Sequence, residues 1–284
     1  MKRTTCLLVG IIATTIGAHA AEKAAWEQHT IAPVVNPIFF EAPQIQTEVR
    51  PIYAHHNLDK DFLGVKADVR LYAVQIRYAV TEKLAIIATK DGYIELDTKG
   101  GKGVEGFADI GAGLKYALYR NDDKQLLITP GITFELPTGS KRVFQGNGDG
   151  EFNLFVSAVK GWDKLHATIN LGGRIPVNFD RETANLRYCG MLDYYTCKWF
   201  IPFVSANAFT TLSEGKAMPL ESEGFDLINF GSSKAAGETQ VAAGVGFRSR
   251  VHKNVDLGFA YEHGCLPDDD IFKDRYTVDL ILHF

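Results

Sequence analysis

The connections between extended segments alternate strictly between short and long along most of this chain. Period-two alternation of apolar and polar residues predicts twelve strands, at about 48–56, 68–80, 84–96, 106–120, 124–136, 152–160, 164–178, 186–196, 199–212, 239–250, 254–262 and 275–284. Every second connection is only two or three residues long, at 81–83, 121–123, 161–163, 197–198 and 251–253. The others are longer and rich in glycine, at 57–67, 97–105, 137–151, 179–185, 213–238 and 263–274. An even strand number with short turns at one end and long loops at the other is the layout of a transmembrane β-barrel.

The last strand supports this interpretation. One face of 275–284 carries apolar side chains, and these are Tyr276, Val278, Leu280, Leu282 and Phe284. Thr277, Asp279 and His283 alternate with them on the other face. In a barrel the apolar face meets lipid and the polar face meets the lumen. A terminal aromatic residue after such a strand is typical of outer-membrane barrels, so we expect Phe284 to be the signal that the barrel-assembly machinery binds.

Composition excludes two other classes of protein. The mean hydropathy of -0.06 is far too low for a helical membrane protein. A barrel escapes this test, because only every second strand residue faces lipid. The formal net charge of -4 gives no basic surface for nucleic acid. A soluble, exported β-sandwich is the alternative fold that composition leaves open.

The N-terminus predicts export. Lys2 and Arg3 precede a mostly apolar run, and Ala18-His19-Ala20 has the form of a cleavage site, so residues 1–20 are predicted to be a signal peptide. We therefore expect the protein in the outer membrane of a Gram-negative-type bacterium. Three cysteines remain after cleavage, Cys189, Cys197 and Cys265. An odd number in an exported chain predicts no complete disulfide framework.

Residues 21–47 form a separate segment before the predicted barrel at 48–284. Pro33, Pro37 and Pro43 are too closely spaced for a helix or a central strand. The apolar cluster 38–40 suits a plug that packs at the barrel mouth, and a loosely attached periplasmic tail is the alternative. Prolines also conflict with a closed barrel at Pro130, Pro176 and Pro202, where each missing N–H requires a bulge or a strand end.

One stretch resembles a known family. Residues 106–116 read GFADIGAGLKY, and they are followed by Thr129-Pro130-Gly131 and by Glu135-Leu136-Pro137-Thr138-Gly139. This pattern over 106–139 resembles the outer-membrane barrel family named for the meta-cleavage pathway of phenol degradation, and the barrel plan extends the likeness over 48–284. The resemblance implies a passive transporter of small molecules, with hydrophobic or aromatic compounds as candidate cargo.

If the apolar faces meet lipid, side chains of the opposite parity line the lumen. These are Gln75, Arg77, Asp91, Glu95, Asp109, Lys115, Glu135, Asn153, His166, Asn170, Arg174, Asp193, Asn207, Arg248, Asp256, Glu262 and Asp279. Both charge signs occur among them. A lumen partly filled by paired charges, with a constriction, is favoured over an open polar pathway.

The longest connection carries an unusual number of apolar residues. Phe225, Leu227, Ile228 and Phe230 predict a loop that folds inward over the mouth or binds something apolar. Gating, ligand capture and simple packing all fit this pattern. Near 145–151, the oxygens of Asn147, Asp149 and Glu151 allow a calcium site, although a flexible external loop fits better.

Enzymatic activity is the rival to transport. A barrel lipase requires a Ser–His pair on its lipid-facing wall. His166 instead shares its predicted face with Thr168 and Asn170, and no serine has the context of a nucleophile. The cysteine and histidine spacing fits no zinc site, so we predict no cofactor. The sequence therefore predicts a passive channel, with a non-conducting barrel whose external loops bind a ligand or partner as the second interpretation and a lipid-acting enzyme as the third.

Overall fold

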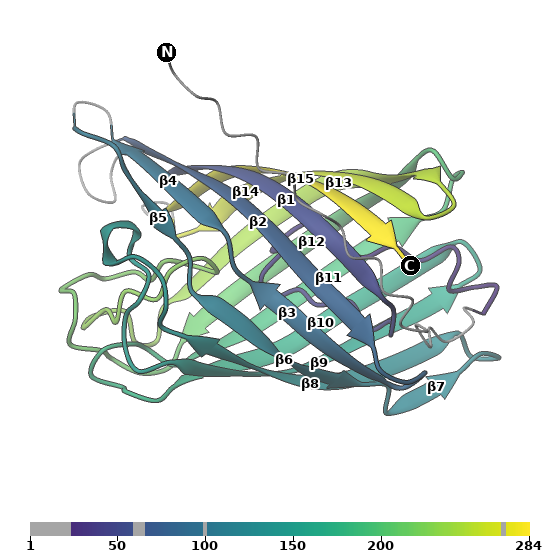
Figure 1. The fold of residues 1–284 in the computed structure, drawn as a ribbon, viewed down its shortest axis with the longest axis horizontal. Helices are drawn as coiled ribbons and strands as arrows, with labels where there is room; N and C mark the ends of the chain where they lie inside the picture. The colour runs from purple at the N-terminus through teal and green to yellow at the C-terminus, as the bar shows by residue number, and fades with distance from the viewer. Residues whose placement is uncertain (1–23, 59–65, 99–100, 268–270) are drawn as a thin grey trace, which may run out of the picture.

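The chain forms a closed antiparallel β-barrel of 12 strands, as the sequence predicts (Figure 1). The computed structural model describes residues 24–58, 66–98, 101–267 and 271–284. The first four strands are β1 (Glu48–Leu58), β2 (Ala67–Ala79), β3 (Leu84–Lys90) continued by β4 (Tyr93–Thr98), and β5 (Val104–Phe107) continued by β6 (Ile110–Tyr116) and β7 (Tyr119–Asn121). The other eight are β8 (Leu126–Leu136), β9 (Glu151–Trp162), β10 (Leu165–Pro176), β11 (Asn185–Tyr194), β12 (Ile201–Thr211), β13 (Thr239–His252), β14 (Val255–Leu266) and β15 (Phe272–His283). β1 pairs with β2 on one side and with β15 on the other, which closes the barrel.

Alternating burial along each strand shows how the sequence produces the two faces of the wall. In β9, Phe152, Leu154 and Val156 are exposed on the outside, whereas Asn153 and Ser157 are buried inside. The outward side chains form an apolar belt around the barrel. Aromatic residues mark its two margins, with Tyr116, Trp162 and Trp199 near the short turns and Tyr72, Phe107, Phe152, Tyr188 and Tyr276 towards the long loops.

The two ends of the barrel differ as expected. In Figure 1 the short turns and the C-terminus lie at the right, and the long loops lie at the left. We call these the turn end and the loop end. The turns occupy 80–83, 122–125, 163–164, 195–200 and 253–254. Residues 59–65, 99–100 and 268–270 of the predicted loops, and the predicted signal peptide, lie outside the described residues. Both ends of the barrel sequence meet at the turn end, where the Phe284 N–H donates to the Thr47 carbonyl at 3.1 Å.

The third strand contains an extra residue, and this changes which side chains face inward. Ile76 of β2 pairs with Ala88, and Tyr72 of β2 pairs with Tyr93. A step of four residues along β2 therefore matches a step of five along its partner. Gly92 has a φ of 121° at this interruption, a conformation that strongly favours glycine. A single extra residue moves every later side chain to the opposite face. Ile94 and Leu96 therefore point into the barrel, whereas the single strand predicted for 84–96 turned the odd-numbered residues inward.

The prolines occupy positions where the pairing tolerates a missing donor. Pro130 lies opposite the interruption between β6 and β7, where Lys115 pairs with Gly131 but Tyr119 pairs with Ile128. This step of four residues against three is the bulge that the proline requires. Pro176 is the last residue of β10, and Pro202 is the second residue of β12.

Residues 30–47 lie inside the barrel and 24–29 lie at its turn end, and together they are named the plug segment here. Three clusters of buried apolar residues fill the interior, and each includes part of this segment, through Ile38 and Phe39, Trp26 and Ile45, or Val34, Val35 and Phe40. The segment thus packs within the barrel interior, and its role as a plug stays a prediction. Among the described residues, no helix is long and apolar enough to cross a lipid bilayer.

Candidate functional site: the occupied lumen

The plug segment enters from the turn end, rises to mid-barrel and returns to β1. The Trp26 indole N–H donates to Asp122 at 3.2 Å, and the His29 ring stacks on Tyr195 at 4.2 Å, so both contacts lie at turns. At its tip, Asn36 reaches the buried Cys189 thiol, with 3.3 Å between Nδ2 and Sγ. The segment turns at 25–29 and 37–39 and is extended elsewhere, so most of its other carbonyls need partners from outside the segment.

Side chains of the barrel wall donate to those carbonyls. The wall donor is named first and the carbonyl acceptor second in these pairs: Arg250 and Thr30 at 2.6 Å, Arg248 and Ala32 at 3.2 Å, Arg50 and Pro33 at 2.5 Å, Gln75 and Pro37 at 2.7 Å, Ser157 and Glu41 at 2.6 Å, Lys115 and Ala42 at 2.8 Å, and Thr129 and Pro43 at 2.7 Å. With Arg187, which donates to the Phe39 carbonyl at 3.5 Å, side chains from seven strands hold this segment through its backbone. Because these bonds involve carbonyls, they depend little on which side chains the plug segment carries.

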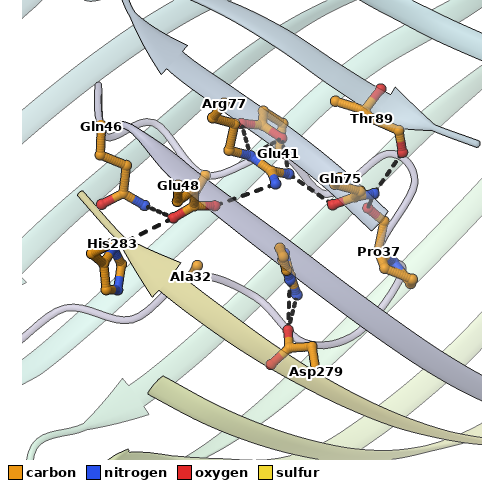
Figure 2. A network of polar contacts seen from close by, with 12 residues as sticks. Ala32, Pro37, Glu41, Gln46, Glu48, Gln75, Arg77, Thr89, Asp279 and His283 are labelled. Atoms are coloured by element: carbon orange, nitrogen blue, oxygen red, sulfur yellow. Dashed lines mark hydrogen bonds and ion pairs between the residues drawn. The ribbon is translucent and has the colours of Figure 1, made fainter. Parts of the chain in front are cut away.

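Glu41 is the main charged anchor of the plug segment (Figure 2). Arg77 on β2 holds both of its carboxylate oxygens, with nitrogen–oxygen distances of 2.7 to 3.2 Å. Lys115 on β6 binds Oε1 at 2.7 Å. Arg77 also lies 3.3 Å from Glu48, which connects this anchor to the first residue of β1. All four side chains are buried, so the charges are held in pairs away from bulk water.

A second buried network joins the wall to itself. Asp279 on β15 accepts from Arg248 through both oxygens, at 2.8 and 2.9 Å, and from Arg50 at 2.6 Å. Two guanidinium groups thus share one carboxylate, and their remaining N–H groups reach the plug carbonyls described above. This arrangement fixes the position of the plug relative to β1, β13 and β15.

Closer to the loop end, Arg275 connects the wall to the longest loop, residues 212–238, which we name the gate loop. Its guanidinium binds Glu262 on β14 at 2.8 Å and Asp226 of the gate loop at 2.7 and 2.8 Å. Glu262 also accepts from the Asn36 backbone N–H of the plug segment at 3.3 Å. Wall, plug and gate loop therefore meet at one ion-pair cluster.

The gate loop folds inward and closes the loop end with apolar side chains. Phe225, Leu227, Ile228 and Phe230 are all buried in one cluster with Ile38 and Phe39 of the plug segment. The Phe225 ring lies 4.3 Å from Phe209 and 4.6 Å from Phe272 between ring centroids. The inward fold predicted for this loop is what the structure shows. Its role as a gate stays a prediction.

A cluster of carboxylates lies beneath the loops between β8 and β11. Lys90 pairs with Glu135, and Arg174 pairs with Glu151 at 2.6 Å. Glu182, in the loop 177–184, is only 5% exposed and faces this cluster. Burial, together with the nearby charges of Glu151 and Glu135, raises the pKa of Glu182 to about 8. The packed loop thus buries a carboxyl group that is neutral at moderate pH.

The calcium interpretation of 145–151 gains no support from this geometry. Glu151 is committed to Arg174 and to Asn229, and Asp149 accepts from Asn178 at 2.8 Å. Within the described ranges, no group of three or more His, Cys, Asp or Glu side chains is placed to hold a metal ion.

Most residues predicted to line the lumen point into the barrel interior. Gln75, Arg77, Asp109, Lys115, Asn153, His166, Asn170, Arg174, Asp193, Asn207, Arg248, Asp256, Glu262 and Asp279 are buried there, and Glu135 is nearly so. Asp109 acts as a loop anchor, accepting from the Gly139 and Gly146 N–H groups at 2.7 and 2.9 Å. Whether these positions line a transport pathway stays a prediction.

Two of the residues predicted to line the lumen, Asp91 and Glu95, lie elsewhere. Glu95 lies on the outer face and pairs with Arg70 at 2.9 Å, because the extra residue near Gly92 reverses the parity of β4. Asp91 lies in the interruption itself, half-buried, where it accepts from the Val74 N–H at 3.0 Å. Neither joins the interior network.

Several interior residues were missing from the prediction. They are Glu41, Glu48, Arg50, Lys90, Glu151, Arg187 and Arg275. Arg187 shares a strand with Asp193, and Arg275 shares one with Asp279, each an even number of residues away. The alternation that placed Asp193 and Asp279 inside therefore also places these two arginines inside. Lys90 was hidden by the bulge, and Glu41 lies in a segment without periodicity.

Two cavities flank the plug segment at the turn end. One of about 550 Å³ is lined by Glu27, Gln44, Arg120 and Asp122 among others, and one of about 440 Å³ by Gln44, Gln46, Arg250 and His283 among others. They form a polar vestibule on either side of the returning plug strand. Deeper in the barrel the interior is filled, at Glu41 and at the apolar cluster of the loop end.

Comparison with known proteins shows the fold and leaves the family unassigned. No family model matches the chain, and no curated protein matches it. Among solved structures, the COG4313 outer membrane channel from Pseudomonas putida F1 superposes with a TM-score of 0.63 at 12% identity, covering 90% of this chain and 100% of that one. The NanC porin superposes with a TM-score of 0.52 at 10% identity, covering 84% and 100%. The chain thus has the fold of outer-membrane channels.

Proposed function

We propose that this protein is an outer-membrane channel for small molecules that rests in a closed state. The observation that carries the proposal is a lumen occupied by the chain's own plug segment, which the wall holds through hydrogen bonds, ion pairs and apolar contacts and without a covalent link. The segment is joined covalently to the wall only at Thr47–Glu48. It can therefore withdraw towards the turn end while the barrel stays closed.

The outer surface supports a membrane location. An apolar belt bounded by aromatic residues matches what lipid requires of a barrel exterior. With residues 1–20 as a cleaved signal peptide, the turn end faces the periplasm and the loops face outward. Phe284, exposed at the end of β15, is then available to the assembly machinery during insertion.

The interior favours polar cargo more than the family resemblance implies. Arginine, lysine and carboxylate side chains from β1, β2, β6, β10, β13 and β15 surround the plug. A charged, hydrogen-bonding wall selects solutes that can replace those contacts. Hydrophobic or aromatic cargo stays an expectation from the resemblance alone.

Conductance in planar bilayers tests the proposal. We compare the mature chain with a variant lacking residues 24–43, and heat-modifiable gel migration verifies that each barrel is closed. The mature chain should conduct little, in brief openings, and the deletion should conduct steadily and at least several-fold more. A closed deletion barrel that conducts no better than the mature chain contradicts the proposal.

The alternative is a non-conducting barrel whose loops bind a ligand or partner. The apolar closure at the loop end favours it, since the gate loop already packs as a folded unit. The same recordings decide between the two. A lipid-acting enzyme fits poorly, because His166 is fully buried in the lumen, bonded to Asp193 at 2.8 Å, rather than on the lipid-facing wall.

A further inference from the structure

The Glu41 side chain occupies a site on the inner wall that has the geometry of a carboxylate receptor. Arg77 presents Nε and a terminal nitrogen to the two oxygens in the planar, two-pronged arrangement that suits a carboxylate. Lys115 approaches Oε1 from another strand at 2.7 Å. The ligand in this site is part of the chain, and the receptor belongs to the barrel.

Lys115 shows that the receptor is incomplete without its occupant. Its ammonium group is buried, and its hydrogen bonds go to the Glu41 carboxylate and the Ala42 carbonyl, both in the plug segment. Arg77 retains Glu48 when the plug leaves, but Lys115 then loses both of these partners. Withdrawal leaves the Lys115 ammonium group and part of the Arg77 guanidinium group without their acceptors on the inner wall, so an anion that replaces Glu41 there stabilises the unplugged state.

The neighbouring groups extend the receptor beyond two cations. Ser157 donates to the Glu41 carbonyl, and Thr129 donates to the Pro43 carbonyl, so hydroxyl donors lie on β8 and β9 beside the ammonium group. Withdrawal of the plug frees these hydroxyls together with the cations. The site is also close to the vestibule, because Gln44, three residues from Glu41, lines both turn-end cavities.

We infer that Arg77 and Lys115 form a binding site for small organic carboxylates, and that such a ligand competes with Glu41 and favours withdrawal of the plug segment. This rests on the proposed function in that the plug must be able to move. It adds the chemical class of the ligand and the residues that recognise it. A neutral solute of the same shape can accept a hydrogen bond from Lys115, but it carries no charge to offset those of Lys115 and Arg77.

The test uses the full mature chain in detergent and isothermal titration with propionate, which reproduces the end of the Glu41 side chain. Propionamide is the neutral probe of the same shape. In Glu41→Gln the internal competitor loses its charge, so propionate should bind at least about tenfold more tightly than to the wild type. Propionamide should bind neither protein, and the double variant Glu41→Gln/Lys115→Gln should lose the gain.

Glu27→Gln is the matched control, because Glu27 is also a buried plug carboxylate but pairs with Arg120 near a turn, at 3.4 Å. It should behave as the wild type. Equal binding of propionate to Glu41→Gln and wild type, or a gain that survives Lys115→Gln, overturns the inference.

A second readout applies if Glu41→Gln does not give a heat-modifiable barrel. Trp26 is buried in the plug segment, whereas Trp162 and Trp199 are exposed on the outer wall. Propionate, and not propionamide, should shift the Trp26 emission of the wild-type protein to the red, and no shift overturns the inference. Both readouts measure binding without flux. If propionate binds but the protein does not conduct, the channel is rejected and the binding site is kept. If the protein conducts but propionate does not bind, the channel is kept and the binding site is rejected.

Discussion

At the scale of single residues, burial decides which charges matter for stability. Asp279 is buried and shared by Arg50 and Arg248, so removing its charge leaves two guanidinium groups without their carboxylate. Breaking a buried pair in this way costs about 3–5 kcal/mol. We therefore expect Asp279→Asn to lower the free energy of unfolding of the lipid-reconstituted barrel by an amount in that range.

Arg70 provides the comparison, since it pairs with Glu95 and Asp97 on the exposed outer face. Water screens an exposed pair of this kind, so Arg70→Gln should change the free energy of unfolding little. Guanidinium titration followed by tryptophan fluorescence measures both variants. Equal losses for the two would show that the interior network is not held apart from water as the structure indicates.

Residue parity explains how far the interior could be predicted. Alternation placed His166, Asn170 and Arg174 inside with no other information, because β10 is regular throughout. It gave the opposite face for Glu95, because the extra residue at the β3–β4 interruption has no hydrophobic signature of its own. Gly92 was the available sign, although a glycine alone does not distinguish a bulge from a turn.

At the scale of elements, the loop 177–184 carries a pH-sensitive contact. The pKa of Glu182 is about 8 when the loop is packed, because burial and the charges of Glu151 and Glu135 disfavour the carboxylate, and it returns to its ordinary value near 4.5 when the loop opens. The packed loop thus binds a proton that the open loop releases. The stabilisation that protonated Glu182 gives the packed loop is present in full below the ordinary pKa, and it is lost as the pH rises through about 8.

Hydrogen exchange of the amides in 177–184 measures this effect. The opening equilibrium should rise by up to about tenfold per pH unit between the ordinary pKa and about 8, and level off above it. Glu182→Gln stays neutral and should show no such slope after correction for intrinsic exchange. The gate loop should loosen in parallel, since Lys216 N–H donates to the Asp180 carbonyl and Leu212 N–H to the Ala184 carbonyl, at 2.9 and 2.7 Å. A slope that persists in Glu182→Gln would assign the effect to another group.

The strands and turns could be predicted closely, whereas the plug and the gate loop could be predicted only as alternatives. Strand periodicity and turn length are local properties of the sequence. The path of residues 24–47 depends on donors from strands far apart in the chain, such as Gln75, Thr129 and Arg248, which meet only when the barrel closes. Prolines indicated an extended segment but not what it would contact.

At the scale of the whole molecule, the lumen is closed twice. The plug segment fills its middle through polar and apolar contacts, and the gate loop covers the loop end mainly through apolar ones. The two closures touch where Ile38 and Phe39 pack against the gate-loop cluster and where Asn36 and Asp226 meet the Glu262–Arg275 pair. In the proposed channel, a pathway through the barrel has to pass both, so they would act as two resistances in series.

This arrangement predicts how conductance responds when each closure is removed alone and together. Phe225→Ala/Phe230→Ala loosens the apolar gate but leaves the plug, so its conductance should stay near that of the wild type. Deletion of residues 24–43 removes the larger resistance and should give an intermediate value. Because the remaining resistance limits each single change, the combined variant should conduct more than the sum of the two separate gains. If the phenylalanine substitutions alone reach the conductance of the combined variant, the plug does not obstruct the pathway, and the gate loop is the only barrier that matters.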